Sequence, residues 1–192
     1  MGKKSWYSTG FKKVREKKES KGGGGNFFSL KDGDEADVRF LDEEPVCIYE
    51  HFVRVGSSAM WFTCLDGTGE ECPACEKGIA KRFSGSFSVI DRRDDKVKLY
   101  KAGIRVLKVL DKINTKKGLT RRDISISRTG GGTDTQYNFM PGDKAPMEGK
   151  DKKKEKLDLE MILKPRGRKK MLEFMESSKT EDDDDDEDDV KF

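Results

Sequence analysis

Four cysteines and a single histidine are the residues of this 192-residue chain that are best suited to chemistry. Cys72 and Cys75 are separated by two residues, a spacing that lets both thiolates bind one tetrahedral ion from a tight turn. Cys64 lies eight positions before this pair, and His51 lies further upstream. Three thiolates and one imidazole make a zinc set without an open position for water or substrate. The pattern therefore predicts a structural Zn²⁺ ion held by His51, Cys64, Cys72 and Cys75.

Cys47 is the competing fourth ligand, and the spacing alone leaves open whether it replaces His51. Free cysteine is often a small buried apolar residue, which is the role that we expect for Cys47. A lone CxxC pair in a cytosolic protein can instead be redox-active. Cys64 and the glycine-rich loop after it favour a metal, and no βαβ pattern surrounds the pair.

A β-hairpin is expected to position the first two ligands. The segment Val46–Val55 is rich in β-branched and aromatic residues, Gly56–Ser58 is typical of a turn, and Ala59–Leu65 returns as a strand. His51 and Cys64 then lie toward the open ends of the two strands. Both side chains can converge there on the loop that carries the CxxC pair.

The rest of the chain also reads as mainly β. Further strands are expected at Ala36–Leu41, Phe87–Ile90, Lys96–Lys101, around Ile124 and Ile126, and at Thr135–Phe139. A helix is expected over Ala102–Asn114, where Val106, Val109, Leu110 and Ile113 have helical spacing and Gly118 supplies the stop. Leu157–Leu163 is either a final strand or the start of a helix, and Arg168–Glu176 has helical spacing. We predict a mainly β fold with a few short helices, an OB-fold-like β-barrel with an inserted zinc-binding subdomain at about residues 47–80.

Composition and charge divide the chain into three parts. Residues 181–192 contain nine acids and one base, which leaves a net charge of +11 on residues 1–180. We expect a basic flexible arm at 1–26, ending in the linker Gly22–Gly25, a domain at 27–176, and a disordered acidic tail at 177–192. A cationic body with an acidic tail is typical of proteins that bind nucleic acid.

The lack of long hydrophobic runs points to a cytoplasmic protein. No apolar run approaches the roughly 20 residues of a membrane span, so no membrane association is expected. No apolar segment follows Met1–Ser5, which argues against a secretory signal. A cytosolic location also argues against disulfides.

Cationic and aromatic residues alternate along the domain, as they do in proteins that hold single strands in cationic grooves with aromatic stacking platforms. Strand alternation sends Phe40, Phe52 and Phe62 inward and places Trp61 on the opposite face. Trp61, Tyr100 and Tyr137 are therefore stacking candidates, with a packing role as the alternative for each. The predicted DNA-binding residues are Arg54, Trp61, Lys81, Arg82, Arg92, Arg93, Lys98, Tyr100, Arg121, Arg122, Arg128 and Tyr137.

No enzymatic constellation is visible, and we expect a protein that is not an enzyme. The only histidine is assigned to the metal, and Gly22–Gly25 lacks the preceding strand and following Lys-Ser/Thr of a phosphate-binding loop. A nuclease that binds magnesium through Asp and Glu is one alternative. A zinc-stabilised transcription or assembly adaptor that binds duplex DNA or protein is another.

Several segments together resemble the zinc-containing single-stranded DNA-binding (helix-destabilising) proteins of T-even-type phages. The order of the four ligands is similar, although the loop between Cys64 and Cys72 is shorter than in that family. Arg128–Tyr137 resembles a strand-turn-strand of the family, and Leu99–Gly103 resembles the strand-to-helix junction before it. The resemblance covers roughly residues 27–140.

This resemblance implies an OB fold, structural zinc and cooperative, sequence-independent coating of single strands in DNA replication, recombination and repair. It also implies a basic N-terminal segment for cooperative self-association, which residues 1–21 match in charge. An acidic tail ending on an aromatic residue, here Asp188, Asp189 and Phe192, resembles tails that recruit replication and recombination proteins such as a polymerase, helicase, primase or recombinase. Such tails also compete with DNA for the groove. A phage-encoded protein of this kind acts in the host cytoplasm.

Overall fold

Seven strands form one antiparallel sheet in the computed structural model, which describes residues 27–66 and 68–177. The predicted arm at 1–26 and the tail residues Asp188, Asp189 and Phe192 lie outside the described residues. The strands are β1 (Glu35–Phe40), β2 (Val46–Val55), β3 (Ser58–Thr63), β4 (Lys81–Asp91), β5 (Lys96–Gly103), β6 (Ile124–Thr129) and β7 (Gln136–Pro141). The helices are α2 (Pro73–Glu76), α3 (Ile104–Lys117), α4 (Leu159–Leu163) and α5 (Arg168–Glu176), with short 3₁₀ turns at Gly132–Asp134 and Asp151–Lys153.

The sheet is open, with the strand order β3-β2-β4-β1-β6-β7 and with β5 paired to β4. A mainly β fold with a few short helices is therefore confirmed. The described strands β3 and β7 end the path without pairing with each other, so an OB-type barrel stays a prediction.

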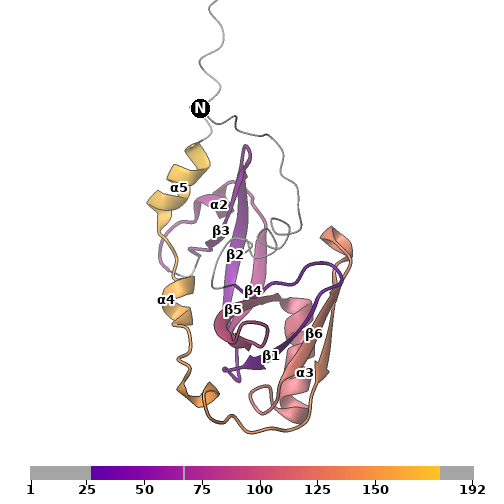
Figure 1. Cartoon of the computed structure of the whole chain (residues 1–192). Helices are drawn as coiled ribbons and strands as arrows, with labels where there is room; N and C mark the ends of the chain where they lie inside the picture. The colour runs from indigo at the N-terminus through magenta and orange to yellow at the C-terminus, as the bar shows by residue number, and fades with distance from the viewer. Residues whose placement is uncertain (1–26, 67, 178–192) are drawn as a thin grey trace, which may run out of the picture.

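Strand β4 connects two halves of the molecule. Residues 81–86 pair with β2, residues 84–91 pair with β5, and residues 89–91 pair with β1. At about 3.3 Å per residue this strand is about 33 Å long. Its start lies with the β2–β3 hairpin, and its end lies with β1, β5 and the turn between β4 and β5 (Figure 1). The expected strand Phe87–Ile90 is thus only the end of β4, because Ser84, Gly85 and Ser86 hide the first half from an apolar pattern.

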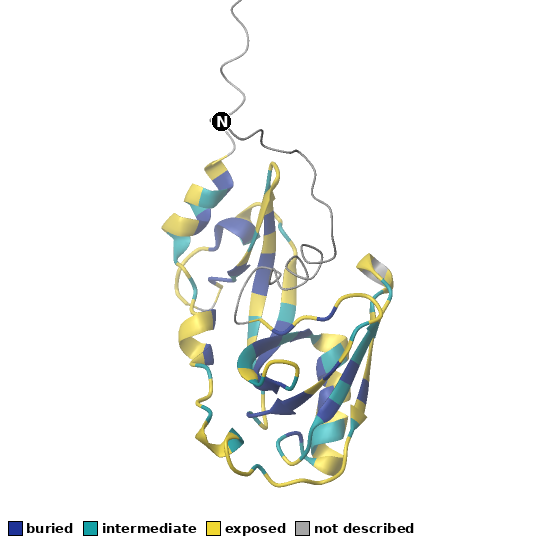
Figure 2. Ribbon diagram, in the orientation of Figure 1, coloured by how far each residue is buried: buried dark blue, intermediate teal, exposed yellow. Residues whose placement is uncertain are grey.

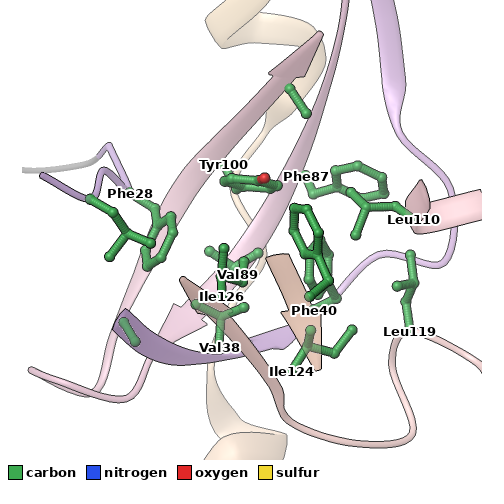
Figure 3. Packing of buried hydrophobic residues seen from close by; sticks show 14 of the residues in the cluster. Phe28, Val38, Phe40, Phe87, Val89, Tyr100, Leu110, Leu119, Ile124 and Ile126 are labelled. Atoms are coloured by element: carbon green, nitrogen blue, oxygen red, sulfur yellow. The ribbon is translucent and has the colours of Figure 1, made fainter. Parts of the chain in front are cut away.

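The main hydrophobic core lies in the half that contains β1, β5, β6 and α3. Phe40 is fully buried, with its ring 5.1 Å from that of Phe87 and 5.8 Å from that of Tyr100, both edge-on (Figure 3). Ile124 and Ile126 fill the space beneath these rings. Burying this many apolar side chains is the dominant stabilising contribution to this half.

Helix α3 covers this core, as the sequence predicts, and ends at Gly118, whose φ of +73° suits glycine. Helix α3 has buried, half-buried and exposed residues (Figure 2). Leu107 and Leu110 are buried, whereas Val109 is exposed. Three of the four expected residues, Val106, Leu110 and Ile113, do lie in or against the core. Leu107 takes the place expected for Val109, so the buried face is rotated by only about 40° from the expected one.

The C-terminal segment returns along the outside of the molecule from β7 to the hairpin (Figure 1). Its α4 resolves the open alternative at 157–163 in favour of a helix, since the Asp158 carboxylate accepts a hydrogen bond from the Met161 amide at 2.9 Å. Met171 and Met175 of α5 are buried against the hairpin. Within the described part of the chain, none of the helices is long and apolar enough to cross a membrane.

Candidate metal centre and cationic groove

Four residues from three elements meet at the hairpin end of β4. His51 comes from β2, Cys64 follows β3, and Cys72 and Cys75 flank the start of the short helix α2. Their ligand atoms all lie within 4.8 Å of one another. His51, Cys64 and Cys72 are buried, Cys75 is half-buried, and all the thiols are free. The structure therefore brings together the four predicted ligands in a cluster that could hold a metal ion.

Distances within the cluster fit a tetrahedral ion. Metal–sulfur bonds of about 2.3 Å and metal–nitrogen bonds of about 2.0 Å place sulfur atoms about 3.8 Å apart and sulfur and nitrogen about 3.5 Å apart. The Cys64 and Cys75 sulfurs are 3.6 Å apart. His51 Nε2 lies 3.6 Å from the Cys72 sulfur and 3.4 Å from that of Cys75. The residues are already at coordination spacing.

A hydrogen bond fixes the histidine for this role. His51 Nδ1 lies 2.9 Å from the Ile79 carbonyl oxygen, which can only accept, so Nδ1 carries the proton. Nε2 is then an acceptor that faces the cysteines, the usual arrangement of a metal-binding histidine with a backbone partner. Cys47 lies outside this cluster and is exposed, so both its role as a rival ligand and the expectation that it is buried are wrong. Cys47 lies four residues before His51 on β2, about 13 Å along the strand from that ligand.

Burial and hydrogen bonds act on the thiols in opposite directions. Burial is the largest influence on Cys72 and would raise its pKa, but hydrogen bonds from the Leu65, Cys75 and Ala74 backbones lower it on balance. Burial and the neighbouring Cys64 and Cys72 raise the pKa of Cys75 to about 12. Three thiolates without a cation are therefore unfavourable here, and a bound cation would reverse this penalty.

A depression of about 540 Å³ lies between β4, the edge of β5, the start of α3 and the β6–β7 turn. We call it the cationic groove. Four cations line it: Arg82, Lys101, Arg105 and Arg128. Phe28, Phe83, Tyr100 and Tyr137 contribute rings. The groove thus unites four predicted residues, Arg82, Tyr100, Arg128 and Tyr137, with Lys101 and Arg105, which the sequence reasoning missed.

The guanidinium groups of this groove have no carboxylate partner among residues 27–66 and 68–177. Arg128 donates to the Leu30 carbonyl at 2.6 Å and to Thr135 Oγ1 at 3.4 Å, which orients it without neutralising it. Arg82 packs across Gly103, where an added Cβ would come within 3.1 Å of its Nη2 atom. Only Lys101 is paired, with the buried carboxylate of Glu50.

An aromatic pair extends the groove onto the hairpin. The rings of Phe52 and Trp61 are 4.8 Å apart, and the two residues are 42% and 39% exposed. The Arg82 guanidinium lies 5.3 Å and the Lys101 ammonium 5.6 Å from the Trp61 ring centroid, and Arg54 lies 5.8 Å from that of Phe52. The expectation that Phe52 points inward is wrong, because Phe52 pairs directly with Trp61 across the hairpin and directly paired residues share a face.

Other predicted DNA contacts lie elsewhere. Lys81 pairs with Asp66 at the rim of the metal cluster. Arg121 and Arg122 lie at the C-terminal end of α3. Tyr137 is 38% exposed, but Tyr100 is only 5% exposed and packs edge-on against Phe28, which contradicts a stacking role for Tyr100.

Three of the predicted DNA-binding cations are paired with carboxylates at the far end of β4. Arg92 pairs with Asp123 at 3.0 Å and with Asp151 at 2.8 Å. Arg93 and Lys98 both pair with the fully buried Asp91, at 2.6 and 2.7 Å. These carboxylates offset their charges, about 30 Å along β4 from Arg82.

No protein-family model matches this chain, and no curated protein matches it either. Function must therefore be inferred from the metal cluster, the groove and the aromatic pair.

Proposed function

We propose that the protein binds single-stranded DNA without sequence preference, and that it coats single strands during DNA replication, recombination and repair. One observation carries the proposal. Three guanidinium groups without carboxylate partners among the described residues, those of Arg82, Arg105 and Arg128, surround a groove that presents the Tyr137 ring. Phosphates neutralise such charges, and an exposed ring stacks on any base.

The aromatic surfaces favour a single strand over a duplex. Tyr137 and the Phe52–Trp61 pair offer ring faces, and only unstacked bases can use them. The Arg82 and Lys101 side chains lie against Trp61 and line the groove as well. A strand can therefore have its phosphates on these cations and bases on the rings at either side.

We also propose that the metal is Zn²⁺ in a structural role, since three thiolates and one imidazole are a typical closed zinc set. Bound zinc contributes folding free energy at the hairpin that carries the aromatic pair. His51, Cys64, Cys72 and Cys75 would hold it, and no position would be left for a substrate, consistent with a protein that is not an enzyme.

The acidic tail has a proposed regulatory and recruiting role. Nine acids within residues 181–192 form a polyanion that competes with DNA for the groove, and Asp188, Asp189 and Phe192 offer a hook for replication and recombination proteins. Deleting residues 181–192 should tighten DNA binding, most strongly at low salt. Unchanged or weaker binding would contradict the competition.

The decisive experiment is an anisotropy titration of labelled oligonucleotides, single-stranded and duplex, with the wild type, Tyr137→Ala and Arg128→Ala. Tyr137→Ala should weaken single-strand binding by roughly 5- to 150-fold, the value of one lost base stack. Lys153→Ala is the matched control, because Lys153 is an exposed cation far from the groove and should change little.

Two outcomes would overturn the proposal. A preference for duplex over single strand would favour a zinc-stabilised adaptor. Cleavage of the oligonucleotide in magnesium would favour a nuclease.

A further inference from the structure

Four cations form a stripe along the exposed face of α3. Arg105, Lys108, Lys112 and Lys116 are spaced by three, four and four residues, and all four are exposed. At 100° per residue this spacing places them within about 80° of one another around the helix axis. These cations lie on the face of α3 opposite to its buried apolar residues.

The stripe begins in the cationic groove. Arg105 lines the groove at the first turn of α3, next to Gly103 and Ile104. From there the helix extends over 14 residues, about 20 Å. The stripe is therefore continuous with the surface that carries the proposed function.

At its other end the stripe reaches a second cationic depression of about 470 Å³. Its cations are Lys116, Lys117, Arg121, Arg122 and Lys144. Arg122 is fixed by hydrogen bonds to the Lys117 carbonyl at 3.0 Å and the Gly142 carbonyl at 2.7 Å. Glu43, the one acid among the described residues that line this depression, accepts a hydrogen bond from Thr120 and forms no ion pair with these cations.

Neighbouring cations of this kind destabilise a helix. Lys108 and Lys112, and again Lys112 and Lys116, are like-charged pairs at i, i+4. No carboxylate in residues 27–66 or 68–177 forms an ion pair with any of the four. Elsewhere the chain neutralises clustered cations, as around Arg92 and Asp91. An uncompensated stripe is expected where an external polyanion supplies the negative charge.

We infer that the α3 stripe and the depression at its end form a second phosphate track that carries the strand onward from the groove. The inference rests on the proposed function. At about 3.4 Å per nucleotide, the spacing of a stacked strand, a 20 Å helix adds at most about six nucleotides to the site. Oligonucleotides too short to leave the groove should therefore not contact Lys108, Lys112 or Lys116.

The test compares dT6 and dT16 binding at several salt concentrations, with the full-length chain and the triple variant Lys108→Gln/Lys112→Gln/Lys116→Gln. The matched control, Lys152→Gln/Lys153→Gln/Lys170→Gln, also removes three positive charges, but from exposed positions outside the track. For dT16 the track variant should bind roughly 10- to 100-fold more weakly at 0.1 M salt, with the slope of log affinity against log salt smaller by about 2. Its affinity for dT6, and both affinities of the control, should match the wild type.

If the track variant binds dT16 with the affinity and salt slope of the wild type, the inference is overturned. The proposed function would still stand in that case if Arg128→Ala loses binding. An equal loss of affinity of the track variant for dT6 and dT16 would also overturn the inference. That outcome would point to the acidic tail as the occupant of the stripe. Absence of single-strand binding by the wild type would instead remove the proposed function itself.

Discussion

The two halves of the molecule are held together by different means. In the half around Phe40, side chains from β1, β4, β5, β6 and α3 meet in one apolar core. In the half around the β2–β3 hairpin, the buried cluster is smaller and includes Cys64 and Cys72 themselves. A chain that is 33% apolar and 40% charged supplies enough apolar area for one core, and a ligand cluster takes the place of the second.

Removing the proposed metal should produce the largest difference in stability between the two halves. If the cluster holds the proposed zinc, chelation or Cys64→Ser removes the charge that offsets the thiolates. The hairpin, α2 and α5 should then lose amide protection while the core half keeps it. Structural zinc contributes about 10–16 kcal/mol of binding free energy in zinc-finger peptides, which makes this the largest expected effect. Hydrogen exchange with metal analysis is the measurement.

Cys47→Ser is the matched control, because Cys47 is a free, exposed cysteine on the same hairpin and outside the cluster. It should keep both metal and protection. A folded Cys64→Ser protein with unchanged metal content would exclude Cys64 as a ligand.

Truncating the core should act on the other half. Phe40→Ala removes a fully buried ring from its contacts with Phe87 and Tyr100, and should cost about 3–5 kcal/mol in urea unfolding. Phe52→Ala, a truncation of the same size at an exposed hairpin position, should cost only about 1 kcal/mol, the value of the lost ring contact with Trp61. Equal losses for the two variants would mean that the hairpin face is covered in solution.

The ligand set was predictable from sequence because a CxxC pair, one upstream cysteine and a lone histidine leave few alternatives. Hairpin ends were also predictable, since Gly56–Ser58 interrupts two β-rich runs. The partners of the charged residues could not be predicted from the sequence. Arg82 and Arg92 look alike in the sequence, yet only Arg92 has folded next to Asp123 and Asp151. Such pairing depends on contacts between segments distant in the chain, which local patterns do not encode.

The buried carboxylate at the far end of β4 gives the core half a pH dependence. Burial would raise the pKa of Asp91, but Arg93 and Lys98 outweigh it and lower the value from 3.8 to about 2. A carboxyl group whose pKa is lowered on folding contributes its full stabilisation at a pH above its pKa in the unfolded chain. About 2 kcal/mol of the free energy of unfolding should therefore be lost as the pH falls from about 5 toward 2.

Asp91→Asn should flatten this dependence in acid unfolding curves and destabilise the protein near neutral pH, because Lys98 is left partly buried without this partner. Asp94→Asn, at an exposed partner of Lys98, should leave the acid transition near that of the wild type.

The smallest effect is expected where the start of α5 is bound to the half around the β2–β3 hairpin. Arg168 donates to Glu76 at 3.1 Å and to the Glu71 carbonyl at 2.9 Å, and its amide donates to the Glu70 carboxylate at 3.1 Å. These groups are exposed, and exposed ion pairs contribute little to global stability. Arg168→Ala should therefore leave the melting temperature nearly unchanged and speed amide exchange only in α5, whose Met171 and Met175 still pack on the hairpin. Lys169→Ala, one residue further on and weakly paired with Glu173, should not change that exchange. If Arg168→Ala also released the metal, α5 would be part of what closes the cluster, and the two halves would differ less in how they are held than the burial pattern implies.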